Sequence, residues 1–442
     1  MKEIIKLKID DLDMLGRGIA HNDNKTVFIE NSLIEEEIEA KLTSEKKGIY
    51  YAENLNILKT SKDRITPLCP YFLDCGGCDL QHLNYEKSLE FKKNQIKNIF
   101  NKVAKIKLND FEIVRSDNVY NYRNKIALKI KSVNGKPFLT MNKKSSHNEI
   151  IVTSCKISDN KFYYVINLVN EFLQNNNIIA YDEKSKKGYA KHIVARIIDN
   201  NLLLTFVFNK LVKLNFEKLY KKLNEKFTKV GINININKFD KDILSDTFIH
   251  IIGIKHIEFS CLNITQKITN SSFLQVNLDI QNKLYNYVLN NIQGTVVNAY
   301  SGAGLLTCII AKNNEKSSIP SAVFGLEINK SASQLADNLC LINNIKNVKN
   351  LCGDANVLLK DLNLKNFNLI VDPPRKGLSD EMIKTILTSK PNKIIYISCS
   401  PNTLAKNISK LTNNFSIEKI KAFDMFPQTV NVETVCILNL KK

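Results

Sequence analysis

One cysteine in the chain is placed where a thiol could act as a nucleophile. Cys399 follows the apolar segment Lys393–Ile397, which is typical of a buried strand, and precedes Ser400 and Pro401, which are typical of a helix N-cap and first helical residue. Because a helix N-terminus favours a nearby anion, we expect the pKa of this thiol to be lowered. Five other cysteines are expected to be inert core residues: Cys261, Cys308, Cys340, Cys352 and Cys436.

A glycine turn, Tyr300–Gly304, follows the candidate strand Thr295–Ala299. Glycine lets the backbone approach a ligand closely, and Glu327, at the end of the next strand, could bind the two hydroxyls of a ribose. The turn lacks the third glycine of a dinucleotide fingerprint, which favours S-adenosylmethionine (SAM) over NAD; a purely structural tight turn is the alternative. Asp354, after the third strand, would then lie near the adenine or be an ordinary turn residue.

A rigid loop, Asp372–Gly377 (DPPRKG), follows the candidate strand Phe367–Val371. Its two prolines fix the backbone and hold Asp372 in place. Methyltransferases that act on amino groups place an aromatic residue after a related box, to stack on the base. Arg375 and Lys376 stand there instead, and they suit a phosphate backbone better; a rigid surface turn is the alternative.

A second group of cysteines has the spacing of a metal site. Cys69, Cys75 and Cys78 form a C-x5-C-x2-C loop, and Cys155 is the best candidate for a distant fourth ligand. Four thiolates in a reducing compartment indicate an iron–sulfur cluster or a metal ion. The spacing alone favours a cluster, with zinc and unliganded thiols as alternatives.

Regular alternation of strands and helices positions the first three motifs. From residue 271 to 442 this alternation predicts a mostly parallel, doubly wound α/β sheet, whose ligands bind at the carboxyl ends of the strands. Each of those motifs directly follows a candidate strand. The remaining strands are expected at Ala322–Leu326, Val348–Cys352, Ile417–Phe423 and Thr434–Leu440.

The first 270 residues divide at about residue 60. Residues 1–60 contain short strands at Ile4–Ile9, Thr26–Ile29, Glu35–Leu42 and Tyr50–Leu58, which predict an OB-type barrel or another small barrel. Residues 61–270 are expected to form an α+β central domain. It begins with the cysteine loop and a helix over residues 84–103, and further on it has a helix at Phe162–Leu173 and a strand at Ile232–Phe239.

Composition limits the classes of protein and of partner. The 442 residues are 44% hydrophobic and 24% charged, which excludes collagen-like and wholly disordered proteins. The net charge of +19 favours a polyanionic partner, although a lysine-rich proteome would give the same excess. Neither a signal peptide nor an apolar run of about 18 residues is present. We therefore expect a cytoplasmic protein that does not associate with a membrane.

Together these motifs resemble those of the RNA uracil-5 methyltransferase family, which makes 5-methyluridine in 23S ribosomal RNA and in tRNA. The resemblance covers nearly the whole chain. It implies a Rossmann-like SAM-dependent methyltransferase domain and an RNA-binding TRAM barrel, marked by the sequence LGRGIAH. It also implies that a [4Fe-4S] cluster is held by Cys69, Cys75, Cys78 and Cys155. The SAM-contacting positions of the family match Gln275, Tyr300, Glu327 and Asp372.

The resemblance also assigns the chemistry. Cys399 matches the nucleophile, and Glu433, after the segment Asp424–Thr429, matches the general base. A thiolate that adds to carbon 6 of uracil makes carbon 5 nucleophilic enough to take a methyl group. A base must then remove the proton from carbon 5 before the thiol can leave. Because a stacked uracil cannot reach these groups, the target base must be flipped out or unpaired.

Two positions depart from the pattern of the family. Asn298 stands where an aspartate is usual, which could weaken SAM binding, and Asn431 stands where a histidine usually precedes the base, which could change the orientation of Glu433. They are the only features that favour a non-catalytic RNA-binding relative. A methyltransferase for exocyclic amines or proteins would not need Cys399. The cluster loop and barrel favour 23S rRNA over tRNA as the substrate, and a monomer is expected.

Overall fold

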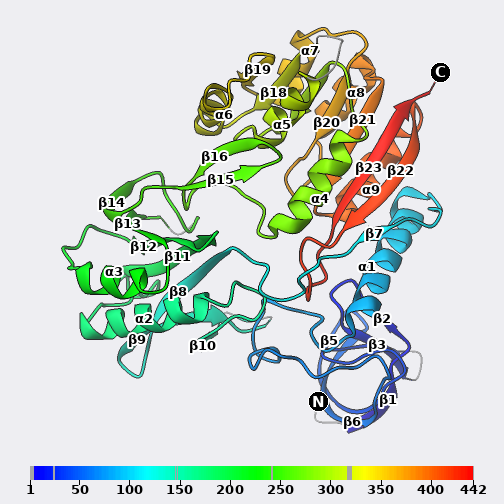
Figure 1. Ribbon diagram of the computed structural model, residues 1–442. Helices are drawn as coiled ribbons and strands as arrows, with labels where there is room; N and C mark the ends of the chain where they lie inside the picture. The colour runs from blue at the N-terminus through cyan, green and yellow to red at the C-terminus, as the bar shows by residue number, and fades with distance from the viewer. Residues whose placement is uncertain are drawn as a thin grey trace.

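The computed structural model describes residues 4–22, 25–144, 146, 148–239, 242–315 and 321–441 of the chain. Three bodies are visible in Figure 1: a small β-domain with the N-terminus, a central α/β body, and a larger body with the C-terminus. No helix in the described ranges is long and apolar enough to cross a membrane.

The N-terminal strands form one sheet in the order β1-β5-β6-β4-β3-β2, which curls round on itself in Figure 1. Alternate residues of β5, such as Ile38, Ala40 and Leu42, are buried in its small core. The predicted strands are present, but the sequence missed β2 and β3, which lie around the glycines of LGRGIAH. The bounds are β1 Ile4–Lys8, β2 Asp11–Leu12, β3 Gly18–Asn22, β4 Lys25–Ile29, β5 Glu37–Lys46 and β6 Ile49–Lys59.

The central sheet has the order β10-β9-β8-β11-β12-β13-β14. Its two helices share one hydrophobic core with the strands and therefore cover the same face. The strand predicted at Ile232–Phe239 begins and ends earlier, and Phe239 is 76% exposed. The bounds are β8 Lys125–Val133, β9 Lys136–Asn142, β10 Glu149–Ile151, α2 Phe162–Asn175, β11 Ala190–Ile198, β12 Asn201–Phe208, α3 Glu217–Asn224, β13 Lys229–Ile236 and β14 Phe248–Gly253.

A connecting segment joins the β-domain to the C-terminal sheet. α1 (Tyr85–Ile99) continues into a π-helical turn, η1 (Phe100–Ala104), and Figure 1 shows α1 rising from the β-domain to the side of that sheet. β7 (Ile113–Val114) then pairs with β22 as the last strand of the sheet. The predicted domain boundary at residue 271 stays a prediction. α1, η1 and β7 precede it in the sequence but pack against the C-terminal body.

The C-terminal sheet is doubly wound, with the strand order β19-β18-β17-β20-β21-β23-β22-β7. β19 to β21 are parallel, whereas β23 runs antiparallel to β21. All seven strands predicted after residue 271 are present to within two residues. The strands are β17 Val296–Ala299, β18 Val323–Glu327, β19 Val348–Cys352, β20 Asn368–Val371, β21 Lys393–Ser398, β22 Phe415–Phe423 and β23 Glu433–Leu440.

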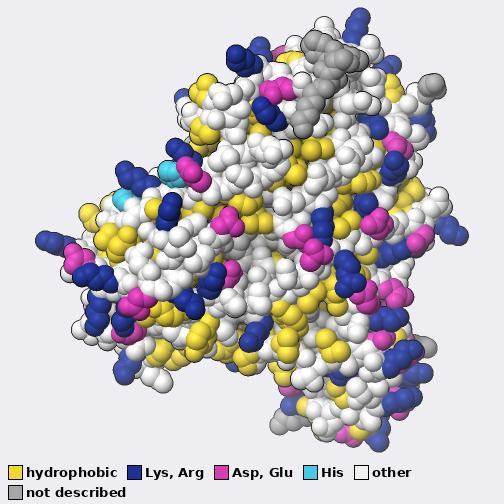
Figure 2. All heavy atoms as spheres, viewed as in Figure 1, with side chains coloured by type: hydrophobic (Ala, Val, Ile, Leu, Met, Phe, Trp, Pro, Cys, Tyr) yellow, Lys and Arg dark blue, Asp and Glu magenta, His cyan; other side chains and the backbone are white. Residues whose placement is uncertain are grey.

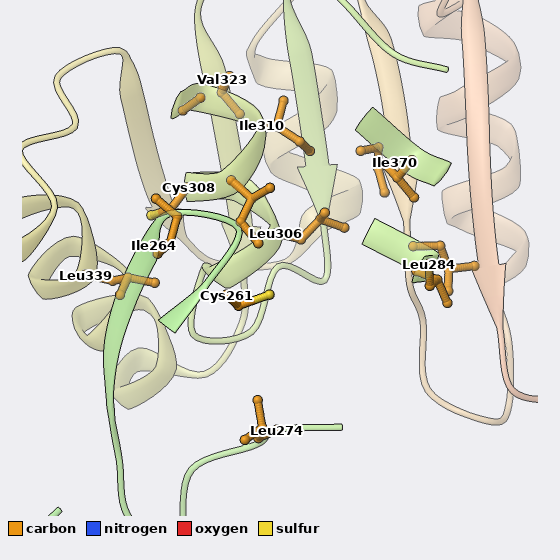
Figure 3. Close-up of a cluster of buried hydrophobic side chains, with 14 of the residues drawn as sticks. Cys261, Ile264, Leu274, Leu284, Leu306, Cys308, Ile310, Val323, Leu339 and Ile370 are labelled. Atoms are coloured by element: carbon orange, nitrogen blue, oxygen red, sulfur yellow. The ribbon is translucent and has the colours of Figure 1, made fainter. Parts of the chain in front are cut away.

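Helices cover both faces of this sheet because neighbouring strand residues point to opposite sides: Val296 joins one core and Val297 the other. The hairpin of β15 (Ile257–Cys261) and β16 (Ile264–Ile268) closes the first core, where Figure 3 shows Ile264 beside Cys308 and Leu339. The helices are α4 Leu278–Leu289, α5 Leu305–Asn314, α6 Lys330–Ile342, α7 Ala355–Asp361, α8 Asp380–Ser389 and α9 Pro401–Leu411.

Candidate active site and cysteine cavity

Cys399 and Glu433 lie at neighbouring strand ends. Cys399 is the first residue after β21, and Glu433 is the first residue of β23. β21 and β23 are antiparallel neighbours, with Ser398 paired to Thr434. The end of one strand therefore lies beside the start of the other, which brings the predicted nucleophile and the predicted base to the same edge of the sheet.

Burial shifts the pKa of both groups upward. The Glu433 side chain is almost fully buried, and its desolvation raises its pKa to about 8; the Asp372 carboxylate adds to this rise and Arg375 opposes it. Cys399 is half-buried, and desolvation, followed by the Glu433 carboxylate, raises the pKa of its thiol. A carboxyl group that titrates near neutral pH is suited to act as a general base.

The predicted lowering of the Cys399 pKa is therefore wrong, although the local structure is the one expected. Ser400 caps α9 by accepting a hydrogen bond from the Thr403 amide at 3.5 Å, and Pro401 is the first helical residue. A helix end contributes only about 0.3–1 kcal/mol, and here burial and two carboxyl groups outweigh it. The guanidinium of Arg375 lowers the pKa in opposition to them.

Arg375 belongs to the predicted rigid loop, which α9 holds in place. Thr403 of α9 donates a hydrogen bond to the Arg375 carbonyl at 3.1 Å, and Asn407 exchanges hydrogen bonds with the backbone of Leu378. A Cβ on Gly377 would lie 2.4 Å from the Asn407 side chain, so only glycine allows this approach. The sequence suggested a phosphate contact for Arg375 and missed its proximity to Cys399.

Asp372 opens the same loop and faces the reacting groups. Solvent reaches its side chain, yet the surrounding protein desolvates it enough to raise its pKa to about 7. Its carboxylate acts on both Cys399 and Glu433. Tyr285 of α4 also lies in the electrostatic range of Asp372 and Glu433. The sequence gave no sign of Tyr285, because it lies in an ordinary amphipathic helix.

The glycine turn stands at the end of β17, with Tyr300, Gly302 and Gly304 at positive φ. The Glu327 carboxylate accepts a hydrogen bond from the Gly302 amide at 2.9 Å and from the Asn329 amide at 2.8 Å. Glu327 therefore braces the turn with its own side chain. A Cβ on Gly302 would meet open space, so the turn has room beside it for a ligand.

Gln275 and three other residues singled out from the sequence make defined hydrogen bonds. Gln275 is half-buried before α4, and its carbonyl accepts a hydrogen bond from the Asn124 side chain at 2.8 Å. Asp354 caps α7 by accepting from the Asn356 amide, which agrees with its reading as a turn residue.

Asn298 is buried and donates to Thr307 at 2.9 Å, so it ties β17 to α5. Asn431 is exposed, and its side chain donates to Thr429.

The four predicted metal ligands line one cavity of about 160 Å³. All four are free thiols, and burial raises the pKa of Cys75 and Cys78, with the neighbouring Cys155 and Cys69 sulfurs adding to the rise. Within the described ranges, however, no group of three or more His, Cys, Asp or Glu side chains converges well enough to hold a metal ion. The sulfurs face a common space instead of one point.

The surface charge does not gather into one stripe on the face shown. In Figure 2 the Lys and Arg side chains lie mainly around the outer parts of the molecule and are intermixed with acidic side chains. Several lysines have an acidic partner, such as Lys93 and Lys97 with Asp110. The net positive charge is therefore spread over the surface in this view.

Comparisons with known proteins agree with this geometry. Residues 84–441 match the family described as tRNA (Uracil-5-)-methyltransferase. An uncharacterized RNA methyltransferase from Staphylococcus aureus strain MSSA476 is 34% identical and covers 98% of this chain and 97% of its own length. One from Staphylococcus epidermidis strain ATCC 12228 is 32% identical. The crystal structure of Pyrococcus abyssi tRNA (uracil-54, C5)-methyltransferase with S-adenosyl-L-homocysteine covers 98% of this chain and 100% of its own, with a TM-score of 0.79 and 24% identity, and shares the fold.

Proposed function

This chain belongs to the tRNA (uracil-5-)-methyltransferase family of SAM-dependent RNA methyltransferases, and from that premise we propose that it methylates carbon 5 of a uridine through a covalent bond to Cys399. The observation that carries the proposal is the juxtaposition of Cys399 and Glu433 at the ends of β21 and β23. A thiol and a buried carboxyl at one strand edge supply the two groups that this chemistry needs.

The reaction divides between these two side chains. The Cys399 thiolate adds to carbon 6, and the electron pair of the carbon 5–carbon 6 double bond moves toward carbon 5 and the oxygen on carbon 4, which gives an enolate. Carbon 5 then forms a bond to the methyl group, with S-adenosylhomocysteine as the leaving group. Glu433 takes the proton from carbon 5, the double bond re-forms, and the bond from carbon 6 to sulfur breaks. Arg375 lowers the pKa of both groups, so it favours the Cys399 thiolate that attacks and the ionised form of Glu433 that is needed before it takes the proton.

The residues at the glycine turn fit SAM. Glu327 is held at the end of β18, where a carboxylate can accept hydrogen bonds from ribose hydroxyls, and the turn leaves open space at Gly302. We assign Gln275, Tyr300, Glu327 and Asp372 to SAM. When bound, SAM supplies the methyl group; the protein residues fix its position against carbon 5.

The proposed substrate is 23S rRNA, with tRNA as the second candidate. The resemblance through the cysteine loop and the N-terminal β-domain favoured 23S rRNA, whereas the Pyrococcus abyssi neighbour, which covers 98% of this chain, is named for tRNA. Mapping of 5-methyluridine in total RNA from a deletion strain decides between them. Loss of a 23S rRNA site supports the proposal. Loss of a tRNA site alone would show that tRNA is the substrate. Loss of neither would favour a non-catalytic relative.

We also propose that Cys69, Cys75, Cys78 and Cys155 hold a [4Fe-4S] cluster. Four thiols around one cavity suit such a cluster better than a single zinc ion, which needs ligands that converge on one point. The cluster would order the surrounding loops. Protein purified without oxygen should be brown and contain about four irons per chain. One zinc and no iron would contradict this assignment. A Cys155→Ser variant should lose folding or RNA affinity before SAM affinity.

The N-terminal domain is proposed to be an OB-type TRAM barrel that binds RNA, in a monomeric cytoplasmic enzyme. The curled sheet supports the barrel, and the charge of +19 supports a polyanionic partner. Because each neutralised phosphate releases counterions, RNA affinity should fall steeply as salt rises. Affinity that is nearly independent of salt would show that the charge is not a binding surface.

A further inference from the structure

The loop that leads to Glu433 has a few hydrogen bonds of its own and several more to distant parts of the chain. This base loop, residues 424–432, joins β22 to β23, and Phe423 pairs with Glu433 across its base. Figure 1 shows it extending from the C-terminal sheet toward the N-terminal domain. Most of the loop is buried, and Gln428 within it has a φ of 68°, in the left-handed region. Contacts with the surrounding chain therefore help to define its shape.

A buried ion pair fixes the first residues of the base loop. Lys92 of α1 donates to the Asp424 carboxylate at 2.5 Å and to the Phe426 carbonyl at 3.1 Å. The Tyr85 hydroxyl donates to the other Asp424 oxygen at 2.8 Å. Lys92 and Asp424 are fully buried. A buried pair costs desolvation and is weak evidence for stability, so a role in fixing one conformation is the better account of it.

The cysteine loop fixes the far end. The amides of Asp79 and Leu80, directly after Cys78, both donate to the Gln428 carbonyl at 3.0 Å. The Asp79 carboxylate accepts from the Val430 amide at 3.2 Å. Leu80 and Val430 also pack against the turn at Gly16 of the N-terminal domain. The N-terminal domain, the cysteine loop and the base loop thus meet at Val430, three residues before Glu433.

Tyr122 forms a second link between the cysteine cavity and the base loop. It packs in the same apolar group as Cys69, Cys78 and Cys155. Its hydroxyl donates to the Pro427 carbonyl at 3.1 Å. The middle of the base loop is therefore anchored by a side chain that contacts the cysteines.

We propose that Lys92, Asp79 and Tyr122 are positioning residues for Glu433: they hold the base loop in the arrangement that presents this carboxylate to carbon 5 of the bound uracil. The inference rests on the proposed function, because it takes Glu433 as the base. Loosening the loop should slow removal of the carbon 5 proton more than it slows attack by Cys399 or SAM binding. Cys399 follows β21, and the residues assigned to SAM lie at the ends of β17, β18 and β20 or before α4, so none of them belongs to the base loop.

The test compares two events on one RNA. RNA with tritium on carbon 5 of its uridines is mixed with enzyme and SAM carrying a ¹⁴C methyl group, and tritium released is divided by methyl transferred. The wild type should release one tritium per methyl. In Lys92→Met and Asp79→Ala this ratio should fall by about threefold or more in the first turnover, and methylated covalent adduct should accumulate.

Matched variants separate positioning from folding. Asp79→Asn keeps an acceptor for the Val430 amide and should restore the ratio, and Tyr122→Phe loses one hydroxyl and should lower it mildly. Lys87→Met on α1 and Tyr163→Phe on α2 change exposed side chains and should leave it unchanged. SAM affinity and melting temperature identify variants that have not folded. If Lys92→Met fails to fold, the ratios of Asp79→Ala and Tyr122→Phe still show whether these contacts position Glu433.

Glu433→Gln is the reference. If it lowers the ratio while folded Asp79→Ala and Tyr122→Phe keep the wild-type value, the positioning role is overturned and the proposed function stands. If Glu433→Gln itself keeps the wild-type ratio, Glu433 is not the base, and the positioning role falls with that assignment.

Discussion

The glycine turn and the base loop lie at the same edge of one sheet but are built in different ways. The polar contacts that shape the turn join residues close in sequence: Asn298 bonds Thr307 nine positions away, and Glu327 bonds Gly302 25 positions away. The side-chain contacts that anchor the base loop to the rest of the protein reach residues 305 to 351 positions away, in the connecting helix, the cysteine loop and the segment before β8. The glycine turn is thus shaped locally, whereas the base loop depends on residues between Asp79 and Tyr122, far away in the sequence.

The largest expected effect is on stability, from a change that removes a long-range contact of the base loop. Asp424→Ala leaves the Lys92 ammonium buried without its partner, which should lower the free energy of unfolding by about 3–5 kcal/mol. Denaturant unfolding measures this. The matched change Asp110→Ala removes an exposed carboxylate that also pairs with α1 lysines, and it should lower the free energy of unfolding far less, because water screens this pair. Equal losses in the two variants would contradict a special role for the buried pair.

A change at the glycine turn should weaken SAM binding and leave removal of the carbon 5 proton unchanged. Glu327→Gln replaces a carboxylate that accepts two backbone hydrogen bonds, so SAM should bind about tenfold more weakly, a loss of about 1.4 kcal/mol. Titration calorimetry measures this affinity. Tritium release per methyl transferred should stay at the wild-type value once SAM is saturating. A fall in that ratio would show that the glycine turn and the base loop are not independent.

A smaller, pH-dependent effect is expected for Arg375→Met. The Arg375 guanidinium lowers the pKa of Cys399 against the effect of burial, so its loss should raise that pKa further and reduce the thiolate fraction at neutral pH. Single-turnover methylation should slow by about fivefold at pH 7, and the difference from the wild type should shrink as pH rises. Profiles that stay parallel over the whole pH range would place Arg375 in RNA binding, as its sequence context first suggested.

The contrast between the glycine turn and the base loop also explains what the sequence could predict. Strand ends, the glycine turn, the N-cap Ser400 and the first helical residue Pro401 are local features, and the structure contains each of them where it was expected. The raised pKa of Cys399 was missed because it depends first on burial, and then on Glu433 at the start of β23 and on Asp372 in the rigid loop, which both raise it. No local pattern shows how deeply such a group is buried.

Long-range pairing was the second limit. Nothing in the sequence around Lys92 distinguishes it from the other lysines of α1, and only the fold shows that it faces Asp424. The short strand β7 could not be predicted either, since two residues carry no periodicity and its partner β22 lies some 300 residues further on. The Cys69, Cys75, Cys78 and Cys155 set rests on the spacing of the first three and on the family resemblance; the four line one cavity, but no metal-holding group converges in the described residues, so the metal site stays a prediction.

The central claim is that Cys399 opens the reaction and Glu433 closes it, and one denaturing gel tests it most directly. Wild type, Cys399→Ala and Glu433→Gln are incubated with RNA and radiolabelled SAM, and the covalent protein–RNA band is measured. Glu433→Gln should accumulate a methylated adduct, because the carbon 5 proton stays and the thiol cannot leave, whereas Cys399→Ala should give neither adduct nor product. Turnover by Cys399→Ala, or the absence of any adduct from a Glu433→Gln protein that binds SAM and RNA, would contradict the account.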